Sequence, residues 1–124
     1  MNILFIMLGG FFGALSRFQL GEWIHTDQGF PLGTLAVNLL GCLVLGWFTA
    51  FAKRKGLRAE YSLLIGTGFL GSFTTFSTFS VETINLITTG EIFLAVTYVL
   101  ISIIAGLLLA FAGFKFATRG GQIK

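Results

Sequence analysis

The sequence predicts an all-α membrane protein with four transmembrane helices, the third of them broken near its middle. Hydrophobic residues make up 55% of the 124 residues and charged residues only 10%, a balance too apolar for an ordinary soluble domain. Four apolar stretches follow one another, at about 2–23, 32–52, 61–89 and 92–117, and each reaches the roughly 20 residues that a crossing helix needs. Since no linker or soluble segment separates them, we interpret residues 1–124 as one four-helix domain.

The first stretch begins directly after Met1 without a basic region, and we interpret it as a retained helix rather than a signal peptide. Gly9 and Gly13 stand four residues apart, a spacing of small residues that lets two helices approach closely. Arg17 continues the same face. Because a charge inside a span is costly, Arg17 either faces a cavity or a partner, or extends to the lipid headgroups.

The second stretch carries one polar and small face, where Thr34, Asn38 and Gly41 stand four and three residues apart. Asn38 lies about 10 Å inside the membrane at 1.5 Å per residue. An asparagine at this depth either joins two helices or serves a function, and the residues alone leave both interpretations open. His25, in the predicted first loop, and Cys42 are single, so the sequence predicts neither a metal site nor a disulfide from them.

The third stretch is too long for one straight crossing, and Gly68, Gly71 and Ser72 offer it a place to break. Irregular backbone inside a bilayer persists only against protein or a water-filled cavity, because lipid offers no hydrogen bonds. We therefore expect the functional site at this break.

Aromatic and hydroxyl side chains alternate after the predicted break. Phe76 and Phe79 enclose Ser77 and Thr78, and Glu82 follows one turn later. One interpretation is a polar path edged with aromatic rings. The other is a plain packing stripe in which the threonines bond back to their own helix. On an unbroken helix that stripe would comprise Phe69, Phe73, Phe76 and Phe79.

The fourth stretch repeats Tyr98, Ser102 and Gly106 every four residues, so that a polar face turns into a packing face. A short loop that we predict between the second and third stretches is strongly basic. Topology and anionic lipid headgroups explain the net charge of +3 better than nucleic acid does. The loop's basic residues are Lys53, Arg54, Lys55 and Arg58.

The chain lacks the residue groups that catalysis needs, so we do not expect an enzyme. It has no nucleophile–base pair, no carboxylate pair, no Cys/His cluster and no phosphate-binding loop. What remains is a path of hydrogen-bond donors and positive charge, from Arg17, Asn38, hydroxyls and the positive edges of rings, which suits a small anion. Backbone carbonyls freed at the break would instead suit a hard cation.

Three segments of the chain combine glycines with polar residues: GGFFGALSR at residues 9–17, GTLAVNLLG at 33–41 and GFLGSFTTFSTFSVE at 68–82. Together they resemble the signatures of the Fluc (CrcB) family of small bacterial fluoride channels. The resemblance covers all four spans in order, and its third segment is very specific. It implies an antiparallel dimer in the plasma membrane with two fluoride pores, each lined by both subunits. Cytoplasmic fluoride would leave passively, without ATP or a redox cofactor.

The resemblance also implies roles for particular residues. Phe76 and Phe79 would form an aromatic box along the pore with Asn38 beside it, and Arg17 would lie in the vestibule. Two positions depart from the family pattern, since many relatives have glycine at Ser72 and some have serine at Gly106. The polar track would comprise Ser77, Thr78, Glu82, Tyr98 and Ser102, and the carbonyls of Gly71 and Thr74 would bind a structural sodium ion (Na⁺) at the dimer axis.

Two alternative functions remain open at this point. A small four-span, proton-coupled multidrug exporter needs a carboxylate deep in its first span, where this chain has Arg17. A non-transporting membrane assembly subunit would use the polar residues only to join helices.

The charges bear on the dimer partner. Lys and Arg flank the spans on one side of the membrane, while the opposite loops hold Glu22, His25, Asp27 and Glu91 and no Lys or Arg. By the positive-inside rule this chain should insert mostly in one orientation. An antiparallel partner is therefore either a second copy or an oppositely biased paralogue.

Overall fold

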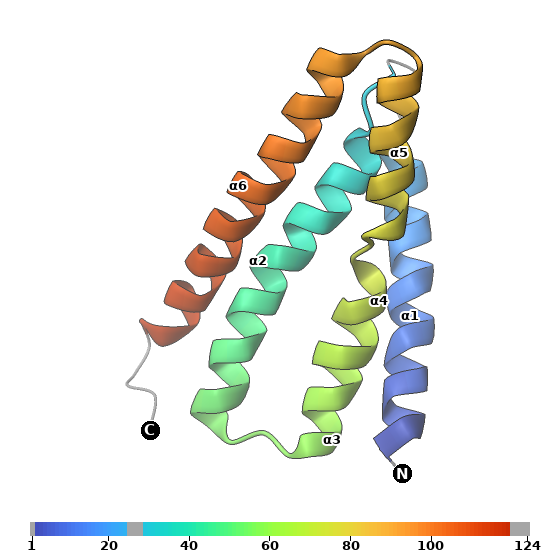
Figure 1. Ribbon diagram of the computed structural model, residues 1–124. Helices are drawn as coiled ribbons and strands as arrows, with labels where there is room; N and C mark the ends of the chain where they lie inside the picture. Colours follow the sequence, from blue (N-terminus) through green and yellow to red (C-terminus); the bar gives the residue numbers. More distant parts are fainter. Residues whose placement is uncertain (1, 25–28, 120–124) are drawn as a thin grey trace.

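Helices account for the architecture of the chain in the computed structural model, which describes residues 2–24 and 29–119 (Figure 1). Within these ranges no residue lies in a β-strand, so the predicted all-α class is confirmed. The loop residue His25 lies outside the described residues. The elements are, in order, α1 (Asn2–Trp23), α2 (Leu32–Lys55), α3 (Ala59–Ser62), η1 (Leu63–Leu70), α4 (Gly71–Phe73), α5 (Ser77–Thr88) and α6 (Ile92–Thr118).

Among the described residues three helices, α1, α2 and α6, are long and apolar enough to cross a membrane. They match the first, second and fourth predicted spans. The prediction of a basic loop is partly wrong, because Lys53, Arg54 and Lys55 form the last turn of α2. That helix ends at Gly56, whose positive φ of 59° is a left-handed conformation that glycine adopts without strain.

The predicted break in the third span is confirmed, but its predicted position is wrong. Gly68 and Gly71 are helical, and the chain leaves the helix at Thr74, where ψ is 155°. Thr74, Thr75 and Phe76 separate a continuous helical segment, made of α3, η1 and α4, from α5. α5 has 12 residues and is too short to cross a bilayer alone. A fourth crossing made by the two halves together stays a prediction.

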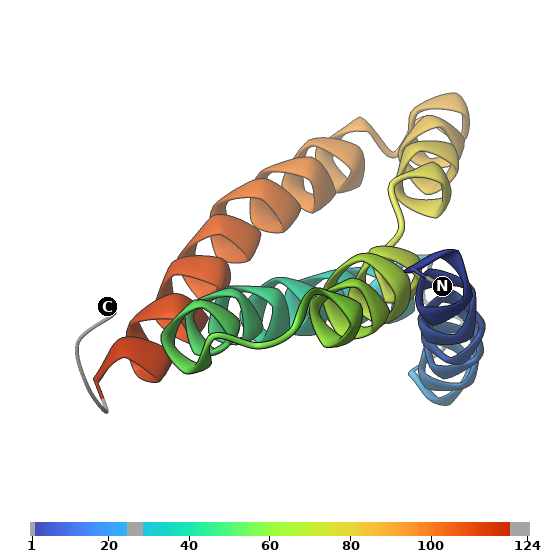
Figure 2. The same ribbon diagram turned by 90° about the horizontal axis from the view of Figure 1, so that it is seen from below.

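α1 packs against η1 and α4 with the two backbones in contact (Figures 1 and 2). Gly9 faces the carbonyl oxygen of Leu64, and Gly68 in return faces that of Ile6, so a methyl group at either glycine would overlap backbone. Gly13 faces η1 in the same way. The close approach predicted from the glycine spacing is therefore confirmed. η1 is a π-helix, whose hydrogen bonds reach one residue further than those of an α-helix and widen its winding.

α2 packs against α6 through a second pair of glycines. Gly46 faces the carbonyl oxygen of Ala110, and Gly113 faces that of Leu43. The chain thus consists of two close helix pairs, α1 with η1 and α2 with α6, and α5 lies beside the upper half of α6 (Figure 1).

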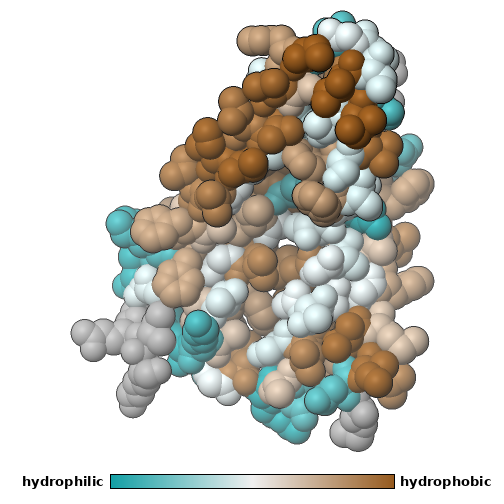
Figure 3. Space-filling view, viewed as in Figure 1, coloured by the Kyte–Doolittle hydropathy of each residue, from teal (hydrophilic) through white to brown (hydrophobic). Residues whose placement is uncertain are grey.

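Large apolar side chains cover much of the outer surface, as expected of helices that face lipid or a second subunit. Figure 3 shows hydrophobic residues over α6 and hydrophilic residues gathered at the lower end of the molecule. Phe76 and Phe93 are each 80% exposed. The buried cluster is small by comparison and lies between α2, α5 and α6. Its members are Leu35, Leu86, Ala95 and Tyr98.

Candidate functional site

The side chain of Asn38 binds both polar backbone groups of Thr75 at the break. Its Nδ2 donates to the Thr75 carbonyl at 2.9 Å, and the Thr75 amide donates to its Oδ1 at 2.8 Å. This two-point contact replaces helical hydrogen bonds that the break removes, because buried backbone groups need partners. Asn38 therefore joins α2 to the broken segment across 37 residues of sequence.

Arg17 extends from α1 to the same break. Its Nε donates to the carbonyl of Ser72 at 3.1 Å, and this contact is partly buried. The hydroxyl of Ser72 donates in turn to the Gly10 carbonyl at 2.7 Å. Of the two alternatives for Arg17, the structure supports contact with a partner inside the protein. It also gives the serine at position 72 a role, since a glycine there would lose the hydrogen bond to the Gly10 carbonyl.

Thr75 lies in the turn, two residues before α5 begins. Its hydroxyl oxygen accepts a hydrogen bond from the backbone amide of Thr78 at 3.2 Å, in the manner of a helix N-cap. The same hydroxyl contacts the side-chain oxygens of Thr78 at 3.1 Å and Ser77 at 3.3 Å. The three hydroxyls thus gather at the N-terminal end of α5.

Glu82 is held between two helices by hydroxyl groups. Its Oε1 accepts from the Thr34 hydroxyl on α2, and its Oε2 accepts from the Tyr98 hydroxyl on α6, each at 2.8 Å. Tyr98 has no exposed surface. A fully buried phenol needs a hydrogen-bond partner, and Glu82 supplies it. The structure brings the predicted residues Glu82 and Tyr98 together and adds Thr34 to them.

The aromatic rings form two separate groups instead of one stripe. Phe69 and Phe73 stack before the break with ring centroids 5.9 Å apart. After the break Phe79 contacts both Phe76, at 5.9 Å between centroids, and Tyr98, at 5.0 Å. The unbroken stripe is therefore not formed, because the backbone turns away at Thr74. Phe79 lies beside the Glu82–Tyr98 contact, while Phe76 points to the surface.

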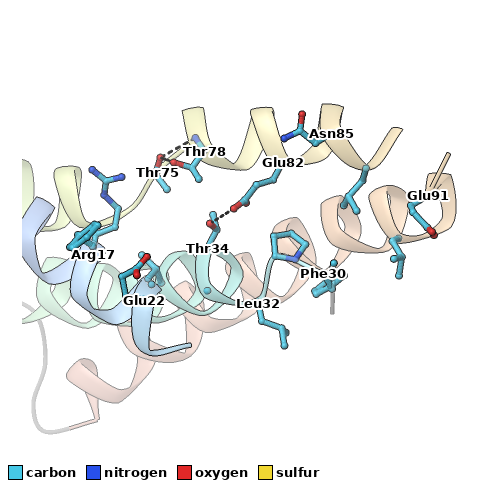
Figure 4. A pocket seen from close by; sticks show the side chains of 18 of the residues that line it. Arg17, Glu22, Phe30, Leu32, Thr34, Thr75, Thr78, Glu82, Asn85 and Glu91 are labelled. Carbon is cyan, nitrogen blue, oxygen red and sulfur yellow. Dashed lines mark hydrogen bonds between the residues drawn. The ribbon is translucent and has the colours of Figure 1, made fainter. Parts of the chain in front are cut away.

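A cavity of about 600 Å³ opens beside these groups, between α1, the start of α2 and α5 (Figure 4). Arg17 reaches into it from α1 toward Thr75, and Glu82 extends from α5 to Thr34. Sequence reasoning missed Thr75 as a functional residue, although it is in the polar run. The cavity's polar and charged lining comprises Arg17, Glu22, Thr34, Thr75, Thr78, Glu82, Asn85, Thr89 and Glu91.

Ser102 lies one turn beyond Tyr98 on α6, and its hydroxyl oxygen is buried without a hydrogen-bond partner among the described residues. Gly106, one turn further, is buried and packs near the sulfur of Cys42. A Cβ atom added at Gly106 would lie 3.4 Å from that sulfur, at van der Waals contact. The polar face predicted on this helix thus ends at Ser102.

Of the two positions that the resemblance assigns to sodium, Gly71 begins α4 and Thr74 is the first residue of the turn. Gly71 is exposed in the single chain, and Thr74 is half-buried, with its methyl group packed on Gly41 of α2. The hydroxyl of Thr74 bonds back to the Leu70 carbonyl at 3.0 Å.

Long apolar helices, packed around a break whose backbone groups are bound by side chains, define a multi-pass membrane protein with a polar path into its interior. Comparison with known proteins agrees with this class. The model of a family described as "CrcB-like protein, Camphor Resistance (CrcB)" matches residues 4–114. The chain therefore belongs to the CrcB-like family.

Curated relatives extend over almost the whole chain. A protein of Oceanobacillus iheyensis named Fluoride-specific ion channel FluC is 50% identical over 117 residues, which are 94% of this chain and 91% of that protein. Fluoride-specific ion channel FluC 1 of Bacillus cereus is 50% identical over 118 residues, 91% of this chain and 86% of its own. Fluoride-specific ion channel FluC 2 of Listeria innocua is 42% identical over 121 residues, 96% and 92% respectively.

Proposed function

We propose that this chain forms a passive, fluoride-selective channel in the plasma membrane, through which cytoplasmic fluoride leaves the cell. One observation carries the proposal. Hydroxyl groups line the cavity beside the break, in a chain that is 50% identical, over 94% of its length, to a protein named as a fluoride-specific channel, and these groups would form the route of the ion.

The chemistry of this route suits a small anion. The hydroxyls of Thr34 and Tyr98 are donors, and the edge of Phe79 carries the positive end of the ring's quadrupole. Glu82 now accepts the hydroxyls of Thr34 and Tyr98. A passing fluoride ion would compete with this carboxylate for the same donors, and a larger, weaker acceptor would compete less well.

The route is completed, in our proposal, by a second subunit in antiparallel orientation. Phe76 is 80% exposed although it belongs to the aromatic pair, and Gly71 is exposed on the same segment. A partner that covers this face would enclose Phe76 as a pore wall. The partner is a second copy of the chain or a paralogue with the opposite charge bias.

The carbonyls of Gly71 and Thr74 fit a structural sodium ion. A hard cation prefers oxygen ligands, and two subunits meeting at this turn would supply about four carbonyl oxygens. The amide hydrogens that would bind these two carbonyls in an unbroken helix are directed elsewhere, Thr75's to Asn38 and Thr78's to Thr75. A bound sodium ion would contribute positive charge at the subunit contact, close to the anion route.

Fluoride efflux from liposomes tests the function. The purified protein is reconstituted into potassium fluoride-loaded vesicles, valinomycin is added to balance charge, and external fluoride is followed with a selective electrode. A channel gives rapid efflux without a proton gradient, and chloride-loaded vesicles release little. Efflux only with a proton gradient would support a proton-coupled exporter, and none above protein-free vesicles would support an assembly subunit.

A further inference from the structure

We infer that Asn38 and the hydroxyl of Thr75 are positioning residues for the cation site, because they withdraw the amide hydrogens that would otherwise bind the Gly71 and Thr74 carbonyls. This inference rests on the sodium site proposed above. It joins that site to the side chain that the resemblance assigns to the fluoride pore.

The first step concerns Gly71. In an α-helix each amide donates to the carbonyl four residues before it, so the amide of Thr75 would bind the carbonyl of Gly71. In the structure it binds Asn38 Oδ1 at 2.8 Å instead. The Gly71 carbonyl is thereby separated from its helical donor by a side chain of another helix.

The second step concerns Thr74. Its carbonyl would accept from the amide of Thr78 in an unbroken helix. That amide donates to the hydroxyl of Thr75 at 3.2 Å. The turn thus separates both proposed ligand carbonyls from their helical donors, one through Asn38 and one through Thr75.

The remaining carbonyls at the turn are treated differently. Ser72 accepts from Arg17 Nε at 3.1 Å, and Thr75 accepts from Asn38 Nδ2 at 2.9 Å. Side-chain donors therefore occupy two carbonyls, while side-chain acceptors draw donors away from Gly71 and Thr74. The two carbonyls whose helical donors are drawn away by side chains are the ones that the family resemblance assigns to sodium.

Asn38 can serve the anion route at the same time. Its amide nitrogen carries two hydrogens, and the bond to Thr75 uses one of them. Replacing Asn38 should therefore change both fluoride flux and sodium affinity, whereas replacing Thr75 should act mainly on sodium.

Sodium-dependent thermal unfolding of the purified protein in detergent tests the inference. The unfolding temperature of wild type is measured against sodium concentration, with N-methyl-D-glucamine chloride keeping ionic strength constant. In Asn38→Ala and Thr75→Val the freed amides can return to the carbonyls, so sodium must displace a hydrogen bond. We expect the half-maximal sodium concentration to rise by roughly tenfold in each, the factor for about one net hydrogen bond.

Two controls separate positioning from general damage. Thr75→Ser keeps the hydroxyl and should keep the wild-type sodium midpoint. Thr83→Val removes a hydroxyl that only bonds back to its own helix, at the Phe79 carbonyl, and should not move the midpoint. A merely structural role would lower the unfolding temperature equally at every sodium concentration, and that result would overturn the inference. If Asn38→Ala does not fold, the comparison of Thr75→Val with Thr75→Ser decides whether the inference holds.

The sodium experiment and the fluoride-efflux experiment can fail independently of each other. A sodium midpoint that is the same in wild type and Thr75→Val overturns the inference alone. Wild-type protein that does not respond to sodium overturns both the sodium site and the inference. Fluoride efflux from liposomes would still stand as a separate measurement in either case.

Discussion

Arg17 donates a hydrogen bond from its Nε to the carbonyl oxygen of Ser72, 3.1 Å away and across 55 residues of sequence. The side chain of Ser72 bonds back to the Gly10 carbonyl on the helix that carries Arg17. Two opposite bonds therefore fix α1 to the C-terminal end of α4. Because that end is where the third span stops being helical, the first helix helps to determine the path of the turn.

Replacing Ser72 with alanine should destabilise the protein by about 1 kcal/mol, the size of one net hydrogen bond, with the Arg17 contact retained. The thermal unfolding temperature measures this change. Ser80→Ala is the matched control, because the Ser80 hydroxyl is exposed and bonds only within its own helix, to the Phe76 carbonyl. Equal effects of the two substitutions would contradict the bridging role of Ser72.

Replacing Phe76 or Phe79 with isoleucine should lower fluoride flux by roughly tenfold or more, a barrier increase of about 1.4 kcal/mol. Stability should fall more for Phe79, which packs on Tyr98, than for Phe76, which is 80% exposed in the single chain. Flux per reconstituted chain and unfolding temperature are measured on the same preparations. Stable variants with full fluoride flux would show that neither ring lines the pore.

Gly9→Ala should destabilise the chain, by about 1–3 kcal/mol, because the added methyl group would overlap the Leu64 carbonyl on η1. Gly10→Ala provides a control at the adjacent position, where an added methyl group has nothing within 4 Å. Because both variants replace a glycine of α1 with alanine, they change its intrinsic helix propensity by the same amount. Unfolding temperatures that fall together would show that backbone contact between α1 and η1 is unimportant.

Charge distribution predicts the orientation of the chain in its cell. With α2 ending in Lys53, Arg54 and Lys55, the chain should insert mainly with this end in the cytoplasm. A cysteine at Gln122, which lies outside the described residues, reports orientation when placed in a Cys42→Ala background. Expressed alone in intact cells, it should resist an impermeant thiol reagent. Comparable labelling from both faces would instead favour the homodimer over a paralogue partner.

Features that depend on residues close together in the chain can be predicted from the sequence. Apolar runs of suitable length give the spans of α1, α2 and α6 to within about three residues, because a bilayer imposes that length. The glycine spacing in the first span predicts close packing, which Gly9 and Gly13 confirm. Glu82 and Tyr98, which the family resemblance assigns to one polar track, are in contact, although they lie on different helices.

The position of the break is not predictable from local sequence. Gly68 is needed for contact with α1, and it therefore stays helical although glycine often marks a helix end. The chain leaves the helix at Thr74 because Asn38, on another helix, supplies partners for the next residue. The contact between Thr34 and Glu82 spans 48 residues and is hidden for the same reason.

The π-helical turns of η1 hold one residue more than α-helical turns over the same stretch would hold. A variant with one residue fewer in η1 could therefore close into an ordinary α-helix while Ser72 still faces Arg17 and Thr75 still faces Asn38. A residue removed from an α-helical stretch such as α1 has no wide turn to compensate for it, and it would rotate every later position of that helix by about 100° around the axis. Single deletions should therefore be tolerated within η1 and rejected within α1.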